Sequence, residues 1–407
     1  MANAAPSLPS LPAELFDIII VQVQDDIHAL AACGLVCRSW LVSSRYHIFK
    51  TTPVSLRPGN AQQFIELVNH PSSTFCTHVR SLELLSSHVP GGSFDAQWLD
   101  PIIGTLARLP CVTDMLIANI QWGNMNPRTK SALLHGFPAL THLELWSTHF
   151  DSVSHLVQLI CSKPLLHILG LDDLAWEDPS FEISACRVPY GLHSLRLSNC
   201  YKRDILDWLV SHEALPPIHH VQLGAVHPED THSIGRFLAR LGPDLFTLQL
   251  EFSSLDAGGD AGIYASIPPQ KIAQRTAEDF CARVDLAQNP ALHTVILDKF
   301  IYYSDYQFSS AVAWIPELVS PIPNLKELSF GIAIRDIGEL HPEENPIDWA
   351  ALDDLFCDPQ LAGLRALRFW VADRVELREV ARVLSHSLPR SSQRGMLHFH
   401  LEPPRLV

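Results

Sequence analysis

The sequence is poor in charge and has no concentration of basic residues. Only 18% of its 407 residues are charged, and 29 Lys and Arg are set against 44 Asp and Glu, which gives a formal net charge of −15. Proteins that bind nucleic acid gain most of their affinity by neutralising phosphates, and anionic membrane surfaces attract basic segments. The charge balance therefore argues against nucleic acid and against a membrane as partners.

The sequence also shows no pattern that predicts a disulfide framework, a leader or a membrane-spanning segment. Its nine cysteines are an odd number, scattered along the chain without a Cys-x-x-Cys pair. The apolar run from Leu15 to Val21 has no basic flank and is interrupted by Asp17, so it predicts neither a signal peptide nor a spanning helix. We expect a reducing compartment, cytoplasm or nucleus, with mostly buried and neutral thiols.

No familiar catalytic or metal-binding motif is present. There is no Gly-x-Ser-x-Gly elbow, no phosphate-binding glycine loop and no His-Glu-x-x-His pair. His212-Glu213 lacks the second histidine, and the adjacent His219 and His220 fall in a predicted strand, where they point to opposite faces. We therefore expect no catalytic residue, no metal and no cofactor.

Apolar residues are plentiful, at 47% of the chain with a mean hydropathy of +0.10, which predicts a folded protein with a continuous core. After a flexible tail over residues 1–8, three short helices are expected. The first begins at Leu11-Pro12 and runs to about Val23, the second follows Asp25-Asp26 and runs to Ala32, and the third runs from Leu35 to about Tyr46.

These three helices hold more apolar surface than they can shelter. Domains of fewer than about 40 residues usually need a metal, a disulfide or a partner to be stable. No metal site or disulfide is apparent, so a partner protein is the remaining solution. The apolar residues in question are Leu11, Leu15, Ile18, Ile19, Val36, Trp40 and Leu41.

The order of motifs in this segment resembles the F-box, in the form common in mushroom-type fungi. The motifs are Leu11-Pro12-x-Glu14-Leu15, an Ile-rich turn of helix, Leu35-Val36-Cys37-Arg38-Ser39-Trp40 and Ser44-Arg45-Tyr46-His47-Ile48-Phe49. One departure is Val23, near a position where the family usually has Leu. The resemblance implies that residues 9–50 dock on a Skp-type adaptor and, through it, on a cullin. Carried over by position, the adaptor-binding residues are Leu11, Pro12, Leu15, Ile19, Val36, Cys37 and Trp40. The alternative is an ordinary helical cap on a repeat protein.

Beyond Phe49 a strand pattern, Leu-x-x-Leu-x-Leu, recurs eleven times. It begins at Val79, Val112, Leu140, Leu166, Leu192, Ile218, Leu245, Leu292, Leu325, Leu364 and Met396. The central positions 143, 169, 195, 221 and 248 are separated by 26, 26, 26 and 27 residues. A period near 26 is typical of leucine-rich repeats with helical returns. The pattern predicts an α/β fold over residues 51–407, a leucine-rich-repeat horseshoe with parallel strands inside and helices outside.

Several details of the repeats are less regular. Helices are expected over 152–162 and 204–211, and loop insertions near 255–270 and 338–348, which are either idle or flaps over the binding surface. The asparagine that the repeat family places three positions after the last Leu is replaced by residues such as Thr148, Leu174 and Cys200. The strand-to-helix turns are therefore expected to be irregular.

Residues between the core positions of each strand face the concave side, because side chains of a strand alternate. Trp and Arg on that side favour a protein target, since these residues often anchor interfaces; alternatively, either Trp packs under a neighbouring loop. The candidate target-binding residues are His142, Glu144, Trp146, Asp172, Arg196, His220, Gln222, Glu251, Arg368 and Trp370.

The function that the resemblance implies is that of a substrate-recognition subunit of a Skp–cullin–F-box ubiquitin ligase, which has no catalytic site of its own and binds an unknown protein target. The alternative is a repeat scaffold that binds proteins and has no ligase role.

Overall fold

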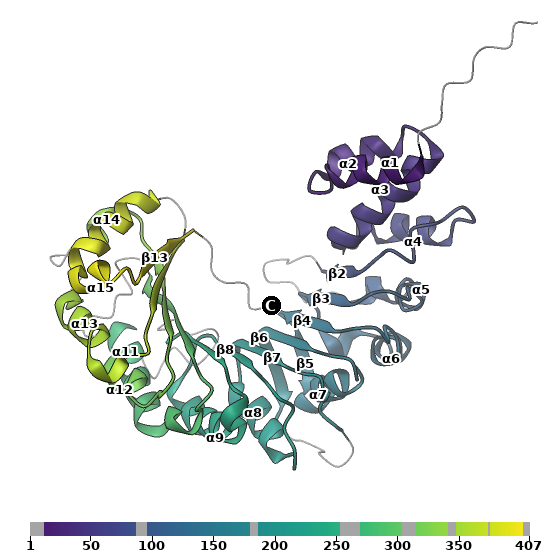
Figure 1. Ribbon diagram of the computed structural model, residues 1–407. Helices are drawn as coiled ribbons and strands as arrows, with labels where there is room; N and C mark the ends of the chain where they lie inside the picture. Colours follow the sequence, from purple (N-terminus) through teal and green to yellow (C-terminus); the bar gives the residue numbers. More distant parts are fainter. Residues whose placement is uncertain are drawn as a thin grey trace, which may run out of the picture. The chain divides into compact units, whose positions relative to one another are not determined.

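A computed structural model describes residues 12–86, 96–179, 186–252, 269–302, 314–340, 347–372 and 375–401 (Figure 1). The chain divides into two compact units, Met1–Asp151 and Ser152–Val407. Each unit combines parallel strands with helices, and each is described here by itself.

The first unit opens with three helices, α1 (Ala13–Val21), α2 (Ile27–Gly34) and α3 (Arg38–Thr51). The Asp26 carboxylate caps α2 by accepting hydrogen bonds from the backbone N–H groups of His28 and Ala29, at 2.9 and 3.0 Å. The third helix begins three residues later than the sequence suggested. Cys37, the residue before it, has extended backbone angles (φ −162°, ψ 171°), so Leu35, Val36 and Cys37 form a connection and not a first turn.

The same unit contains the first repeats, which form a parallel sheet in the order β1-β2-β3-β4. Its strands are β1 (Val54–Leu56), β2 (Ser81–Leu85), β3 (Asp114–Ala118) and β4 (His142–Trp146), followed by β5 (His149–Ser152). The helices between them are α4 (Ala61–Asn69), α5 (Ile103–Leu106) and α6 (Pro127–His135), with short 3-10 turns at Gln97–Leu99 and Trp122–Asn124. The sequence analysis missed β1, because three residues are too few to show the repeat pattern.

The helical head and the first repeats share a core. Phe49 near the end of α3 stacks on Phe75, with ring centroids 4.6 Å apart, and its carbonyl accepts a hydrogen bond from the backbone N–H of Arg80, which precedes β2. These contacts explain why the compact unit continues past residue 50, where the sequence analysis placed the end of the helical module.

The second unit is a longer parallel sheet, with its strands in chain order from β6 to β13. The strands are β6 (Ile168–Asp178), β7 (Ser194–Cys200), β8 (His220–Leu223), β9 (Thr247–Leu250), β10 (Thr294–Tyr302), β11 (Glu327–Ala333), β12 (Ala366–Ala372) and β13 (Leu397–His400). The helices are α7 (Val153–Cys161), α8 (Lys202–Ser211), α9 (Thr231–Leu241), α11 (Pro269–Arg283), α12 (Trp314–Val319), α13 (Trp349–Phe356), α14 (Leu377–Ser387) and α15 (Pro389–Gln393). Short 3-10 turns lie at Pro228–Asp230, Gly242–Asp244, Leu286–Gln288, Ile337–Leu340 and Pro359–Leu361.

Within this second unit the sheet curves, with the strands on the inner side and the helices along the outer side (Figure 1). The predicted fold class, α/β with leucine-rich repeats, is confirmed. The repeated apolar positions form the core: Leu143, Leu195, Val221 and Leu248, which hold the same place in four strands, are all buried. Burying one such side chain contributes about 1.5–3 kcal/mol, and stacked repeats cover each other's apolar faces.

The turns after the strands are more regular than the sequence suggested. Two positions after the last apolar residue of the strand pattern, the backbone takes a left-handed conformation in six repeats. These residues are Asn119, Ser147, Asp173, Asn199, Ala225 and Lys299, with φ between 46° and 58°. Non-glycine residues rarely adopt such angles, so the recurrence reflects a common backbone bend that does not need the family's asparagine.

The two predicted insertions fall mostly outside the described residues. Of the first, 255–268 are not described and α11 begins at Pro269; of the second, 341–346 are not described and a 3-10 turn occupies Ile337–Leu340. No flap can therefore be assigned to either. Among the helices in the described ranges, none combines the length and the apolar character needed to cross a membrane.

Fewer thiols are buried than the sequence suggested. Cys357 is buried and Cys37 exposed, while the other seven cysteines are intermediate, and all nine are free thiols. Burial raises the pKa of Cys161, Cys200 and Cys281 to about 12, so these three thiols are neutral at physiological pH.

Candidate protein-interaction sites

Helix α1 has an inward and an outward apolar face. Phe16 and Ile20, four residues apart, face inward: Ile20 is fully buried, and the Phe16 ring lies 5.7 Å from that of Trp40 on α3. Leu15, Ile18 and Ile19 form the outward stripe and are exposed, Ile18 by 58%. Since a helix brings residues three and four apart onto one face, the outward stripe is continuous.

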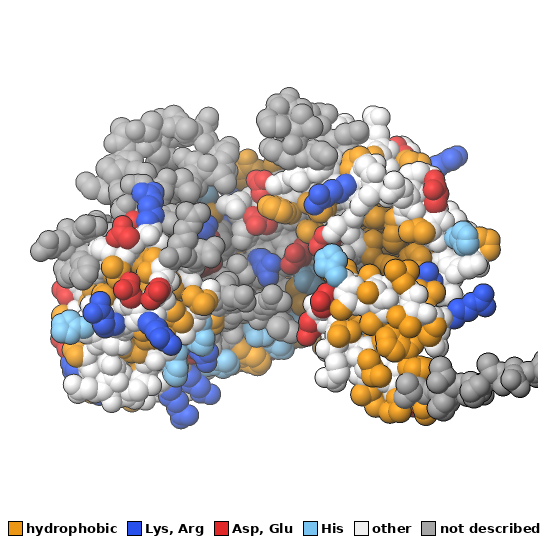
Figure 2. Space-filling view, turned by 90° about the horizontal axis from the view of Figure 1, so that it is seen from above, with side chains coloured by type: hydrophobic (Ala, Val, Ile, Leu, Met, Phe, Trp, Pro, Cys, Tyr) orange, Lys and Arg blue, Asp and Glu red, His pale blue; other side chains and the backbone are white. Residues whose placement is uncertain are grey.

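The connection between α2 and α3 adds to this exposed apolar surface. Leu35 is 89% exposed and Val36 is 64% exposed, which is unusual for side chains of this type. In Figure 2, hydrophobic side chains gather over α1–α3. A patch of this kind marks a protein-binding surface more often than a free one.

Of the seven predicted adaptor-binding residues, five are exposed, one is half-buried and one lies outside the described residues. Pro12, Leu15, Ile19, Val36 and Cys37 are exposed, Trp40 is half-buried against Phe16, and Leu11 lies outside the described residues. The sequence analysis did not assign Ile18 or Leu35 to the site. The spacing of Leu15, Ile18 and Ile19 could have identified Ile18, whereas Leu35 was placed in a helix that begins only at Arg38.

A second candidate site lies on the inner face of the first unit's sheet. The inner-face residues of β4 are His142, Glu144 and Trp146, alternating with the buried Leu143 and Leu145. Trp146 is 52% exposed and is not packed away. A pocket of about 190 Å³ opens on this face, lined by Ser81 and Glu83 of β2, Asp114, Met115 and Leu116 of β3, and His142 and Glu144 of β4.

His142 is held between two carboxylates. Its Nδ1 lies 3.3 Å from Asp114 on the neighbouring strand, and its Nε2 lies 3.2 Å from Glu144 on its own strand. The hydrogen bonds to Asp114 and then to Glu144 raise the pKa of His142 to about 9, while the bond from His142 holds the pKa of Asp114 below its ordinary value. The imidazole is therefore positively charged at neutral pH.

The charge on His142 makes the stability of the protein depend on pH. The folded-state pKa of about 9 exceeds the ordinary 6.5, so the stabilisation is complete below pH 6.5 and is lost as the pH rises through 9. Denaturant unfolding of the wild type and of His142→Gln is expected to give a free-energy difference that shrinks steadily from pH 6 to pH 9.5. A difference that stays constant over that range would contradict the assignment of a charged imidazole.

In the second unit the structure groups some of the predicted target-binding residues on β6–β8. Arg196 and Gln222 are register partners, and the Nε of Arg196 donates a 3.0 Å hydrogen bond to the Gln222 side-chain oxygen. Asp172 accepts a 3.0 Å hydrogen bond from Asn199. His220 lies on the same face, half-buried, and burial lowers its pKa. These four residues form a mixed polar surface.

The remaining predicted residues lie on or just after later strands, and each has a partner within the second unit. Glu251, just after β9, is buried and its carboxylate is 2.6 Å from the Lys299 ammonium. Arg368 on β12 lies 2.9 Å from Glu327, and the half-buried Trp370 stacks on His400 at 4.6 Å. Glu251 therefore offers a target little direct contact, and His400 covers one face of the Trp370 ring.

Histidines that precede four of the strands contact aromatic rings of neighbouring repeats. The rings of His167 and His193 lie 5.5 Å apart, and the Phe246 ring stacks between His219 at 4.7 Å and His293 at 6.0 Å. Within the described ranges, no group of three His, Cys, Asp or Glu side chains is arranged to hold a metal ion.

Comparison with known proteins yields no matching family model and no matching curated protein. Solved structures with similar folds include the yeast Rad7 and Elc1 complex (14% identity, TM-score 0.33, 90% of this chain and 91% of that chain). A leucine-rich repeat-containing protein, LegL7 from Legionella pneumophila, gives 14% identity and a TM-score of 0.39 over 78% of this chain and 89% of that one. The chain spans 37% of the length of the protein in a TLR13–ssRNA13 complex (13% identity, TM-score 0.32, 77% of this chain). Similarity at this level carries no information about partners.

Proposed function

We propose that this protein is the substrate-recognition subunit of a Skp–cullin–F-box ubiquitin ligase. Residues 9–50 act as the F-box and dock on a Skp-type adaptor, and through it on a cullin. The repeats of residues 51–407 hold a protein target, so that the binding energy raises the local concentration of the target at the ligase's catalytic partner. The protein itself performs no chemistry in this scheme.

The observation that carries the proposal is the exposed apolar patch on α1 and on the α2–α3 connection. Six large apolar side chains are exposed there, Leu15, Ile18, Ile19, Val21, Leu35 and Val36, while the fully buried apolar side chains among the described residues of α1 and α2 are those of Ile20 and Leu30. Covering such side chains with a partner stabilises the complex by roughly 25 cal/mol for each Å² of apolar surface removed from water. The patch coincides with the residues that carry the resemblance to the F-box.

Binding of the full-length protein to a recombinant Skp-type adaptor tests this proposal. We expect the two proteins to co-elute from a size-exclusion column as one complex, and a pull-down from cells to recover the adaptor together with a cullin. A protein that elutes alone and recovers neither component would instead be a repeat scaffold without a ligase role.

A further inference from the structure

The pocket on the inner face of the first unit has acidic walls and an apolar floor. Two rows of register partners cross β2, β3 and β4: Ser81, Asp114 and His142 form one, and Glu83, Leu116 and Glu144 the other. Leu116 therefore lies between two glutamates whose Cα atoms are about 10 Å apart, twice the spacing of neighbouring strands. An aliphatic side chain flanked by carboxylates suits a ligand that is itself apolar along its length and cationic at its end.

Two acidic groups of this pocket, Glu83 and Asp114, have no Lys or Arg partner among the described residues. Glu83 accepts a hydrogen bond from the Ser55 hydroxyl, which is neutral, and Asp114 is bonded by Thr113 and His142. Neither Glu83 nor Asp114 forms an ion pair with a Lys or Arg in the part of the chain that the structure describes. The His142 imidazolium lies between Asp114 and Glu144, and the register partner of Glu83 is Leu116.

Trp146 adds a second recognition element on the same face. It lies two residues beyond Glu144 on β4, and half of its surface is exposed. An exposed indole binds cations over its ring face and packs against the aliphatic part of Lys or Arg. Exposed Trp is also the residue type that most often anchors a protein interface.

We infer that this pocket receives a Lys or Arg side chain from a basic segment of the target protein, with Glu83 and Asp114 binding the charged end and Leu116 and Trp146 the aliphatic stem. This inference rests on the proposed function, because it identifies the class of target that the repeats would hold. It also explains how a chain with a net charge of −15 selects partners, since complementary charge speeds association and rejects acidic proteins.

A peptide library with one fixed central residue tests the inference on the full-length protein. We expect fluorescein-labelled peptides with central Arg or Lys to be retained over those with the neutral analogues citrulline or acetyl-lysine. The preference should fall about tenfold in Glu83→Gln, which removes one charge-assisted contact and leaves the Asp114–His142 pair in place. The double variant Glu83→Gln with Asp114→Asn should lose it entirely.

The control is Glu66→Gln, which removes an exposed carboxylate of the same unit from the outer helix α4 and should keep the full preference. No preference for a basic centre in the wild type, or a preference that survives in Glu83→Gln and in the double variant, would overturn the inference. Adaptor binding is measured on the same preparations, so that the pocket and the ligase role are tested separately. Both pocket variants leave α1–α3 intact and should bind the adaptor. A wild-type protein that binds the adaptor but shows no preference for a basic centre counts against the pocket alone, whereas a wild-type protein that shows the preference but does not bind the adaptor counts against the ligase role.

Discussion

Replacing both Leu35 and Val36 with Asp is expected to abolish adaptor binding by the full-length protein and to leave its unfolding temperature unchanged. Both side chains are exposed in the free protein, by 89% and 64%, so the change removes no core contact. In the complex it replaces two buried apolar groups with charges. Losing roughly 4 kcal/mol of apolar burial, before any cost of burying the carboxylates, weakens binding about 1000-fold.

The Leu35/Val36 double variant tests adaptor binding more specifically than a change at Trp40 does, although Trp40 belongs to the same predicted site. The Trp40 ring packs on Phe16, so Trp40→Asp would disturb the contact between α1 and α3 as well as any adaptor contact. Loss of binding in that variant would therefore have two explanations. Leu35 and Val36 lie in the connection between helices and make the result specific.

A matched control is available in the second unit, where Leu165 and Tyr190 are also large, apolar and exposed, by 52% and 79%. The double variant Leu165→Asp with Tyr190→Asp introduces the same two charges in a different unit from α1–α3 and should bind the adaptor as the wild type does. Calorimetric titration of the adaptor into each protein measures the difference. Equal affinities for the wild type and the Leu35/Val36 variant would refute docking through this patch.

The repeat fold could be predicted because each strand repeats one pattern of burial. Leu143 and Leu145 point into the core and His142, Glu144 and Trp146 point away, as the alternation in the sequence requires. A spacing of 26 residues then fixes which residues of neighbouring strands become partners, such as Arg196 and Gln222. Sequence alone was sufficient here, because the core and the register depend on the same leucines.

The chemistry of the inner face was less predictable, because it depends on pairs between strands. The sequence analysis identified His142 and Glu144 but not the role of Asp114, 28 residues earlier, which holds the other nitrogen of the imidazole. Aligning the repeats would have placed Asp114 beside His142, since they are register partners. The partner of Glu251 could not be read this way, because Lys299 follows 48 residues later, beyond the insertion that interrupts the regular spacing of the repeats.

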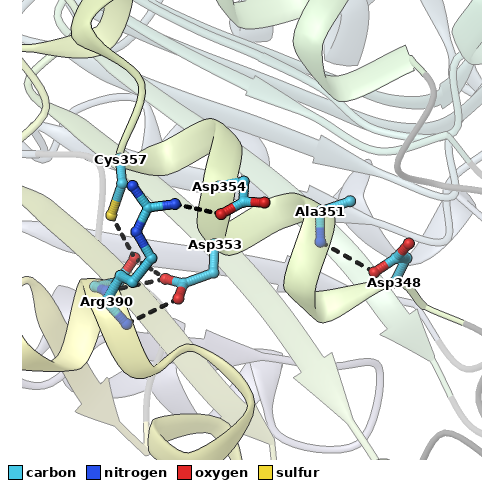
Figure 3. A network of polar contacts seen from close by, with 7 residues as sticks. Asp348, Ala351, Asp353, Asp354, Cys357 and Arg390 are labelled. Atoms are coloured by element: carbon cyan, nitrogen blue, oxygen red, sulfur yellow. Dashed lines mark hydrogen bonds and ion pairs between the residues drawn. The ribbon is translucent and has the colours of Figure 1, made fainter.

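The largest effect on stability is expected from Asp353, a buried residue of α13 that caps α15 (Figure 3). Its carboxylate accepts hydrogen bonds from the backbone N–H groups of Arg390 and Ser391, at 2.8 and 2.9 Å, and from the Ser391 hydroxyl at 2.6 Å. Asp353→Ala would leave these three donors without their acceptor inside the protein. Charged hydrogen bonds and buried unsatisfied donors together give an expected loss of about 3–5 kcal/mol in the free energy of unfolding.

The neighbouring residue provides a matched control from the same helix. Asp354 forms an ion pair with the Arg390 side chain, but its own side chain is 71% exposed, so Asp354→Ala is expected to cost less than about 1 kcal/mol. Chemical denaturation of both variants should therefore separate them clearly. Equal effects would mean that the surface ion pair, and not the buried cap, fixes α15.

Because Asp353 lies in the last repeats, Asp353→Ala is expected to destabilise those repeats before the others. A repeat array is stabilised by contacts between neighbours, so weakening a terminal repeat frays that end before the rest unfolds. The backbone N–H of Met396 donates to the Ser391 carbonyl at 3.1 Å, and the N–H of Leu367 on β12 donates to the Met396 carbonyl at 2.8 Å. Hydrogen exchange in Asp353→Ala should therefore lose protection in α15 and β13 first, while β6–β8 stay protected. Uniform loss of protection across the second unit would show instead that its repeats unfold as one cooperative block.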